Sequence, residues 1–246
     1  MLDEIHLLGK KIDYAGSPVL LRSAPDENWE RDWMPMAGEW SYSDGALIGR
    51  EGGNKGGILF SRQSFDDNVM ISFTVSTVLP ATRDLNAVFC AHWDKEGTDY
   101  LAESYVCGLN GWYEHKSGLE RNPVAGNPYS HLNSTTTLYH YTPGKEVRMT
   151  AGAIDGHTFM VVDDELVSEM IDPHPIKDGH VGFSPYCTIL RIRDIEVRKI
   201  KWEPFPSHTT RSFNKAHIAV FDAKTVHAPP YLRKKSRKIP TDKKEL

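Results

Sequence analysis

"EVRMTAGAIDGHTFMVVDDELVSE" (residues 146–169) decides the fold class of this chain. Two runs of alternating apolar and polar residues flank Asp155-Gly156, a residue pair that favours the tight turn of a β-hairpin. A second tight reversal at Asp163-Asp164 leads into another strand-like run. The stretch therefore predicts consecutive antiparallel β-strands.

Strand periodicity continues on the N-terminal side of this hairpin. In "NVMISFTVSTVL" (residues 68–79) every second residue from Val69 to Val75 is apolar, which indicates a half-buried strand. "LNAVFCAHW" (residues 85–93) is apolar on both parities, which is typical of a strand in the middle of a sheet. Because side chains alternate between the two faces of a strand, we expect one face of this strand to carry Asn86, Val88, Cys90 and His92.

The alternation changes phase in "CTILRIRDIEVRKI" (residues 187–200), where the apolar residues move from even to odd positions. Such a change predicts a β-bulge around Arg193-Asp194. Glycine-rich turns and proline-bounded loops separate the strands, and no segment shows helical periodicity over more than two turns. Many strands joined by turns predict an all-β protein, either a sandwich or a jelly roll.

Charge is spread unevenly along the chain. The last fourteen residues hold seven basic and two acidic residues, a charge of +5, while the rest holds 22 basic and 31 acidic residues, a charge of −9. A basic tail can contact nucleic acid, but the acidic body argues against a nucleic-acid partner. We expect residues 1–203 to form a β-sandwich domain, residues 204–232 to form an extension that packs on it, and residues 233–246 to form a basic flexible tail.

Composition favours a cytoplasmic protein. No stretch approaches the roughly 18 consecutive apolar residues that span a bilayer, and the N-terminal segment lacks the pattern of a secretory signal. We therefore expect no membrane partner. The three cysteines form no CxxC or Cys/His zinc pattern, so we expect reduced thiols. The eleven histidines are scattered, and the sequence indicates no metal site and no cofactor.

"GLNGWYEHKSGLERNP" (residues 108–123) gathers the side chains best suited to chemistry. A β-elimination needs a base that removes a carbon-bound proton and an acid that protonates the departing oxygen. His115 can serve either role near neutral pH, and Tyr113 or Glu114 can supply the other group. Because adjacent residues of an extended segment face opposite ways, His115 and Lys116 do not both reach one site, and His115 is the preferred reactive residue.

The central strand offers a second set of candidates. If its even-numbered face is concave, Asn86 and His92 would line the floor of a groove and Trp93 its lip. The alternative for this strand is that His92 is a core histidine with its hydrogen bonds satisfied inside the fold and that Asn86 is structural. The alternative for residues 108–123 is a surface loop whose charges pair with one another. The predicted catalytic residues are His115, Tyr113 and His92, and the predicted substrate-binding residues are Asn86, Trp93, Asn110, Trp112, Lys116, Glu120 and Arg121.

The order of motifs resembles a known family over roughly residues 28–200. "GEWSYSDGALIG" opens the region and "DGHVGFSPYCTILRIRDIEV" ends it, and both resemble the concanavalin A-like sandwich of 3-keto-disaccharide hydrolases. The middle, "DLNAVFCAHW" followed by "HKSGLERNP", is similar to the YesU-like group of the same fold, a sandwich associated with pectin-utilisation clusters. The matching residues are Gly38, Trp40, Asp44, Gly45, Leu47, Gly179, Gly182, Phe183, Arg193, Asp194 and Ile195.

The resemblance implies a concanavalin A-like jelly-roll β-sandwich of two antiparallel sheets and a carbohydrate substrate. It also implies a 3-keto glycoside, because a ketone beside the reacting carbon acidifies the proton that a base removes. The glycosidic bond then breaks by elimination, and hydration follows. The E-x-D-x-x-E strand of retaining glycoside hydrolases of this fold is absent from the sequence, as is the Q-I-H motif of the alginate lyases.

We therefore expect a carbohydrate-active enzyme that cleaves or eliminates a glycoside by acid/base chemistry. Its partner would be a small carbohydrate or glycoside, and the sequence leaves a homo-oligomer open. The rival hypothesis is a non-catalytic carbohydrate-binding sandwich in which Trp112, Trp93 and Tyr105 stack on sugar rings. A third is a subunit of a hetero-complex that completes the site of a partner.

Overall fold

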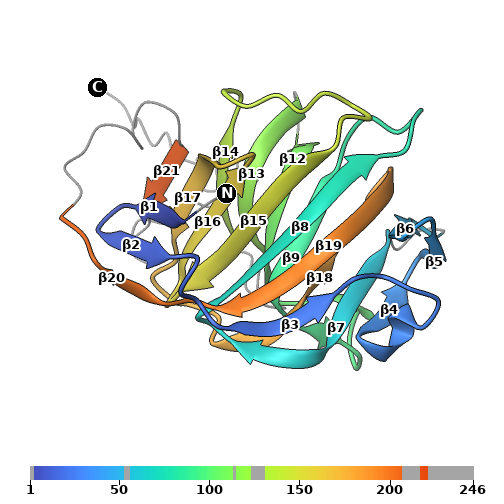
Figure 1. Cartoon of the computed structure of the whole chain (residues 1–246), viewed down its shortest axis with the longest axis horizontal. Helices are drawn as coiled ribbons and strands as arrows, with labels where there is room; N and C mark the ends of the chain where they lie inside the picture. Colours follow the sequence, from blue (N-terminus) through green and yellow to red (C-terminus); the bar gives the residue numbers. More distant parts are fainter. Residues whose placement is uncertain (1–2, 53–55, 113–114, 123–130, 207–216, 221–246) are drawn as a thin grey trace, which may run out of the picture.

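The computed structural model describes residues 3–52, 56–112, 115–122, 131–206 and 217–220 (Figure 1). β-Strands make up nearly all of its regular structure, and the helical turn at Trp29–Arg31 has three residues. This confirms the predicted all-β class. Within the described ranges, no helix is long and apolar enough to cross a membrane.

Two large sheets form the layers of a sandwich, and Figure 1 shows β8, β15 and β19 of one sheet in front of the strands of the other. The seven-stranded sheet has the order β14 (Leu132–Thr136), β13 (Lys116–Asn122), β12 (Ser104–Trp112), β9 (Leu85–Ala91), β18 (Asp178–Phe183), β7 (Ile58–Asp66) and β4 (Trp33–Ala37). The nine-stranded sheet has the order β21 (His217–Val220), β17 (Glu165–Ile171), β16 (His157–Val162), β15 (Val147–Ile154), β8 (Val69–Thr77), β19 (Ile189–Lys199), β6 (Ala46–Arg50) and β5 (Glu39–Ser43). β3 (Val19–Ser23) also pairs with β19.

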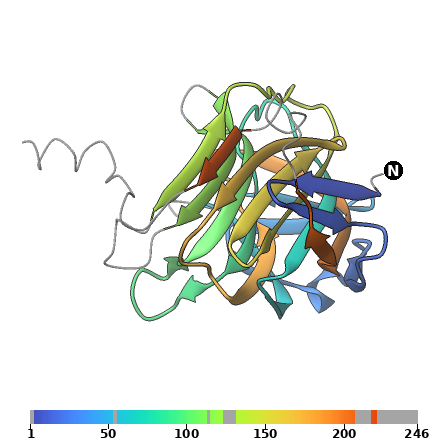
Figure 2. The same ribbon diagram turned by 90° about the vertical axis from the view of Figure 1, so that its left-hand side faces the viewer.

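Two smaller sheets lie on the outer faces of the sandwich. β1 (Glu4–Leu7), β2 (Lys10–Asp13) and β20 (Trp202–Pro204) form one of them, and their apolar side chains pack on the nine-stranded sheet. β10 (Trp93–Asp94) and β11 (Tyr100–Leu101) form a hairpin, whose apolar residues pack on the seven-stranded sheet. Figure 2 shows β1 and β2 (dark blue) at one side of the molecule and this hairpin (sea green) at the other.

One apolar layer fills the space between the two large sheets. Phe73 of β8 and Phe183 of β18 meet edge to face with ring centroids 5.0 Å apart, so the two sheets touch directly. Trp33 of β4 extends this contact, with its ring centroid 5.5 Å from that of Phe183. Burial of each such side chain stabilises the fold by about 1.5–3 kcal/mol, and this layer therefore holds the sheets together.

The predicted turns and bulge are confirmed. Asp155-Gly156 joins β15 to β16 with positive φ at both residues, 47° and 79°. Asp163-Asp164 joins β16 to β17, again with positive φ, 48° and 67°. In β19 the pairing with β8 shifts register just after Arg193, where the backbone of the next residue has φ 53°.

The prediction that Asn86 and His92 share one face of β9 with Cys90 is wrong. Cys90 has φ 47° and points into the core between the sheets, whereas Val88 and Ala91 belong to an apolar cluster on the outer face. A residue in the left-handed region interrupts the alternation of a strand. The side-chain row that begins at Asn86 therefore ends before His92.

The C-terminal part of the chain adds strands to two sheets. β20 pairs with β2, and β21, inside the predicted 204–232 extension, pairs in parallel with β17. The predicted tail, residues 233–246, lies outside the described residues. The division of the chain at residue 203 stays a prediction.

A buried chain of polar contacts ties β2 to the nine-stranded sheet. Lys10 Nζ lies 3.1 Å from His157 Nδ1, and His157 Nε2 lies 2.7 Å from Glu169 Oε2. The backbone N–H of Leu8 donates to the same carboxylate oxygen at 2.8 Å. Burial lowers the pKa of Lys10, and the charges of Asp155 and then Glu169 partly offset that shift. The buried Glu169 carboxylate is tolerated because His157 and the Leu8 N–H contact it.

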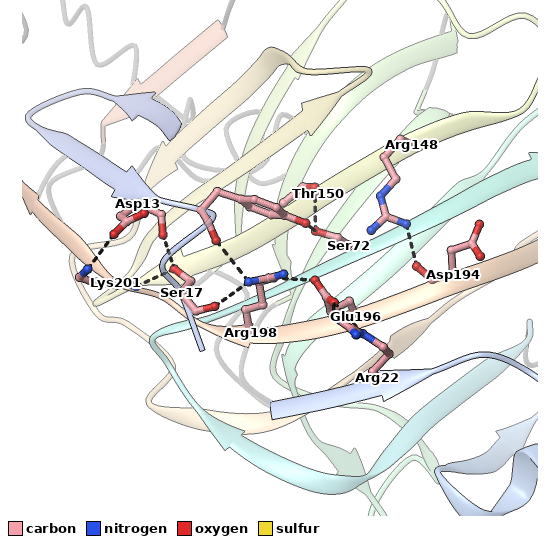
Figure 3. A network of polar contacts seen from close by, with 11 residues as sticks. Asp13, Ser17, Arg22, Ser72, Arg148, Thr150, Asp194, Glu196, Arg198 and Lys201 are labelled. Carbon is pink, nitrogen blue, oxygen red and sulfur yellow. Dashed lines mark hydrogen bonds and ion pairs between the residues drawn. The ribbon is translucent and has the colours of Figure 1, made fainter. Parts of the chain in front are cut away.

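An arginine network fastens the N-terminal segment to the outer face of the nine-stranded sheet (Figure 3). Arg198 donates to the backbone oxygens of Ser17 at 2.7 Å and Tyr14 at 3.4 Å, and to Glu196 at 2.5 Å. Its guanidinium also lies 5.0 Å from the centroid of the Tyr14 ring. The Tyr14 hydroxyl donates to Ser72 Oγ at 3.1 Å, so the segment is anchored to β8 as well as to β19.

Replacement of Arg198 by Met is expected to lower the free energy of unfolding by about 2–3 kcal/mol, because hydrogen bonds from charged groups contribute about 1.5–3 kcal/mol. Arg198 is 15% exposed. Arg22→Met is the matched control: Arg22 donates to the same Glu196, but it is 70% exposed and its loss should cost less than about 1 kcal/mol. Urea denaturation measures both, and equal losses would contradict the anchoring role of Arg198.

Candidate functional site

The outer face of the seven-stranded sheet is divided into a covered half and a polar half. Val88 of β9 and Phe60 of β7 are fully buried in the covered half, under the β10–β11 hairpin. Trp93 of that hairpin meets Phe60 edge to face at 6.4 Å between ring centroids. The hairpin therefore leaves the part of the face over β9, β12 and β13 for polar groups.

Glycines shape this polar half. Gly118 pairs with Gly108, and Gly108 pairs with Asn86, so the three residues lie side by side across the sheet. A Cβ on Gly108 would stand 2.0 Å from Asn86 Oδ1, and a Cβ on Gly111 would stand 3.0 Å from it. A larger residue at position 108 would therefore force the Asn86 side chain to move.

The indole of Trp112 lies beside Gly108 as well. Its Cζ3 atom is 3.4 Å from the position of a Cβ on Gly108, and its Nε1 donates a hydrogen bond to Glu120. Glu120 also lies 3.2 Å from His131 Nε2 and 3.5 Å from Asn133 Nδ2. The Trp112–Glu120 contact therefore frames the polar half on the side of β14.

Asn86 carries a buried oxygen without a hydrogen-bond donor, and the buried Asp84 carboxyl lies next to it. Asp84, which is 3% exposed and has φ 59°, directly precedes β9. In the described part of the chain, three buried side-chain oxygens have neither a hydrogen bond nor an ion pair: Asn86 Oδ1, Thr188 Oγ1 and Glu169 Oε1. Each such atom costs about 1–3 kcal/mol. Asp84 Oδ2 likewise has no hydrogen bond, but it pairs with Arg83 Nε at 3.0 Å. Asn86 Oδ1 belongs to the residue two positions after Asp84, so the unpartnered oxygen and the buried carboxyl are neighbours in the sequence.

Burial raises the pKa of the Asp84 carboxyl to about 6, because the charged form loses its hydration. Two neighbours oppose this shift: Arg83, whose Nε lies 3.0 Å from Asp84 Oδ2, and Asn86, whose side chain hydrogen-bonds the carboxyl. The negative charge of Glu51 adds to the rise in pKa. A carboxyl that titrates near pH 6 can hold a proton and give it up close to neutrality, as a general acid or base must.

A second group of side chains comes from the segments that follow β6 and β18. Glu51 Oε2 accepts a hydrogen bond from the backbone N–H of Cys187 at 2.9 Å. A Cβ on Gly56 would stand 3.3 Å from the Tyr100 hydroxyl and 3.4 Å from the Tyr186 ring. Burial, and then the charges of Tyr186 and Glu51, raises the pKa of Tyr100. We name as the Asp84 site the residues Glu51, Arg83, Asp84, Asn86, Tyr100, Trp112 and Tyr186. Nowhere in the described ranges do three or more His, Cys, Asp or Glu side chains lie together as metal ligands would.

Two of the predicted catalytic residues, His115 and His92, do not meet. β9 and β12 run antiparallel, so the end of β12 lies beside the start of β9. His115 follows the end of β12 and His92 follows the end of β9, which separates the two by about 20 Å of strand. His92 Nε2 instead lies 2.9 Å from the backbone oxygen of Asp178. Tyr113 lies outside the described residues.

Two predicted substrate-binding residues are engaged inside the fold. The buried Asn110 side chain donates to the backbone oxygens of Tyr141 at 3.0 Å and Thr82 at 3.4 Å, so it holds the loop that leads to the Asp84 site. Arg121 is buried on the core side of β13, where its Nε lies 2.6 Å from Asp172 Oδ2. Arg121 therefore faces away from the polar half of the outer face.

The remaining predicted binding residues lie on the outer face. Asn86, Trp112 and Glu120 come together there, and Lys116 pairs with Trp112 across β12 and β13. Trp93 belongs to the covered half.

Sequence reasoning missed Asp84, Glu51, Tyr100 and Tyr186. The "DLN" motif held the available signal for Asp84, since residues two apart in a strand share a face. Glu51, Tyr100 and Tyr186 come from separate segments, and no spacing in the sequence shows that they are neighbours.

No family model matches the chain, and no curated protein matches its sequence. Among solved structures, it is similar to a protein of unknown function with a galectin-like fold from Bacillus subtilis, with a TM-score of 0.58 and 15% identity over 74% of this chain and 96% of that chain. It is also similar to the carbohydrate binding module CBM66 from Bacillus subtilis, with a TM-score of 0.55 and 12% identity over 68% of this chain and 95% of that chain. Likeness at this level of identity concerns the fold, and it confirms the predicted concanavalin A-like β-sandwich.

The raised pKa of Asp84 predicts a specific pH dependence of stability. Between pH 3.8 and about 6 the native protein holds a proton that the unfolded chain releases, so the free energy of unfolding falls as pH rises through this window. The total loss is at most about 3 kcal/mol. Asp84→Asn removes this dependence, so the variant should gain stability relative to the wild type between pH 4 and about 7.

Urea denaturation at a series of pH values measures this difference. Asp3→Asn, which removes an exposed carboxyl remote from the sheet, is the control and should run parallel to the wild type. A stability difference between Asp84→Asn and the wild type that stays constant from pH 4 to 7 would show that Asp84 is not buried as a neutral acid.

Proposed function

We propose that the polar half of the outer face binds a saccharide and that the protein cleaves a glycoside there, with Asp84 as the acid. The observation that carries the proposal is the unpartnered Asn86 Oδ1 next to the buried Asp84 carboxyl, whose pKa burial raises to about 6. A sugar hydroxyl is a donor that can satisfy the Asn86 oxygen. The aromatic ring of Trp112 beside it supplies the apolar surface on which a sugar ring stacks.

The chemistry follows from the state of Asp84. A departing sugar oxygen is a poor leaving group unless it gains a proton as its bond to carbon breaks. Asp84, with a pKa of about 6, carries that proton in part of the molecules at neutral pH. The resemblance to 3-keto-disaccharide hydrolases favours a 3-keto glycoside as the substrate, since its ketone makes the neighbouring carbon-bound proton removable by a weak base.

A non-catalytic saccharide-binding sandwich is the second candidate. The structural likeness to a carbohydrate binding module favours it, as does the fixed Trp112–Asn86–Gly108 arrangement, which needs no reaction to explain it. The raised pKa of Asp84 distinguishes the two candidates, because binding alone gives no reason to keep a carboxyl close to its protonated form.

An NMR time course with glucosides and their 3-keto forms tests the proposal. Asp84→Asn is expected to lower the rate of glycoside cleavage about 100-fold or more, since general acids contribute factors of about 10² to 10⁴. His115→Ala is the matched comparison, because His115 is exposed on the β12–β13 turn and should leave the rate within a few-fold of the wild type.

Each outcome has a distinct meaning. If the His115→Ala variant is inactive and the Asp84→Asn variant is active, the catalytic group lies in the 108–123 segment and not at Asp84. If no product forms and the sugar resonances broaden equally with the wild type and Asp84→Asn, the protein binds saccharides without cleaving them, and the enzyme hypothesis is wrong.

A further inference from the structure

Glu51 stands at the end of the sandwich where Asp84 leads into β9. It directly follows β6, whose last residue pairs with Ile189 of β19. The backbone oxygen of Ile189 accepts a hydrogen bond at 2.8 Å from Val78, in the segment that leads to Asp84. The ends of β6 and β8 and the start of β19 therefore meet at one place, and they bring two carboxyls from separate segments together.

The position of Glu51 is held by the backbone. Its Oε2 accepts the N–H of Cys187 at 2.9 Å, and Cys187 itself has a strained φ of 52°. A hydrogen bond from the backbone leaves the second carboxylate oxygen of Glu51 for another contact and fixes the direction of the group. Such positioning on the scaffold is what a proton-transfer group requires.

The charge of Glu51 acts on two other groups of the site. It raises the pKa of Asp84 and that of Tyr100, in each case after the larger effect of burial. Glu51 therefore lies within electrostatic range of both. Two interacting carboxyls tend to separate into one that keeps its proton and one that stays ionised, which is the pattern of an acid and base pair.

We propose that Glu51 is the proton acceptor that complements Asp84 in glycoside cleavage. This inference rests on the function proposed above. Glu51 takes the proton from the carbon beside the ketone, and the electron pair of that bond forms a carbon–carbon double bond as the glycosidic C–O bond breaks. The departing oxygen keeps the pair from its bond and takes the proton of Asp84. The step leaves Glu51 protonated and Asp84 ionised, and solvent restores both.

The other members of the Asp84 site fit different roles. Tyr100 has a raised pKa and stays protonated at neutral pH, so it can donate a hydrogen bond to the enolate oxygen but cannot accept the proton. Arg83 is a permanent cation beside Asp84. The Asn86 amide has no basic atom. Glu51 is the carboxylate that remains within the cluster.

Deuterium exchange measures removal of the carbon-bound proton without cleavage of the glycosidic bond. The probe is 3-keto-1,5-anhydroglucitol, which has the acidified carbon-bound proton but no leaving group. Glu51→Gln is expected to slow enzyme-dependent exchange at that carbon about 100-fold or more, whereas Glu27→Gln should keep the wild-type rate. Gln can still accept the Cys187 N–H, and Glu27→Gln, an exposed glutamate elsewhere, is the control.

A titration adds a readout that needs no substrate. In ¹³C NMR of the Asp84 carboxyl, Glu51→Gln should lower the pKa of Asp84, and Glu27→Gln should leave it unchanged. An unchanged Asp84 titration in Glu51→Gln, or full exchange by that variant, overturns the role of Glu51 while cleavage by the wild type still supports the proposed function. A wild type that neither exchanges nor cleaves overturns both.

Discussion

Contact between the two sheets through one apolar layer is the constraint on which the remaining structure depends. Phe73 and Phe183 meet across this layer, and every residue of the same parity on their strands must also be apolar or be paired. The buried ion pair of Arg121 with Asp172 shows the alternative, a charge that is tolerated on the core side because it has a partner at 2.6 Å. The alternate residues of the same strands point to the outer faces of the sandwich, where they can contact a ligand.

The two outer faces use this freedom differently. On the nine-stranded sheet, β1, β2 and the segment anchored by Arg198 occupy the face, and polar groups such as Ser72 and Tyr14 bond to one another. On the seven-stranded sheet, the β10–β11 hairpin occupies one half only. The other half keeps the unpartnered Asn86 Oδ1 and the buried Asp84 carboxyl. The cost of about 1–3 kcal/mol for an unpartnered oxygen is small beside the burial that the core supplies, so the fold can sustain a site that is not optimised for stability.

Strand period and turn chemistry made the fold predictable. The hairpin at Asp155-Gly156 and the bulge before Ile195 follow from local rules, because a tight turn or a phase change leaves its mark within a few residues. The same rules failed at Cys90, whose left-handed backbone conformation interrupts the alternation of side chains along β9, so His92 does not continue the row of side chains that starts at Asn86. Within the site, Asn86, Trp112 and Glu120 could be identified by residue type. Arg121, predicted to bind substrate, lies on the core side of β13, so residue type alone does not show which face of the sheet a side chain is on.

Glu51 marks the limit of sequence reasoning. Its place near Asp84 depends on where β6, β8 and β19 of the nine-stranded sheet end relative to the start of β9 in the seven-stranded sheet, and bulges, turn lengths and the register of β6 against β19 set those positions. Each of these shifts a strand by one residue, which is about 3.3 Å, and an error of one residue in any of them would separate the two carboxyls. Strand ends are also where backbone groups leave the sheet ladder and can hold a side chain, as Cys187 holds Glu51. A site assembled there gains geometric precision from the scaffold while its residues remain scattered in the sequence.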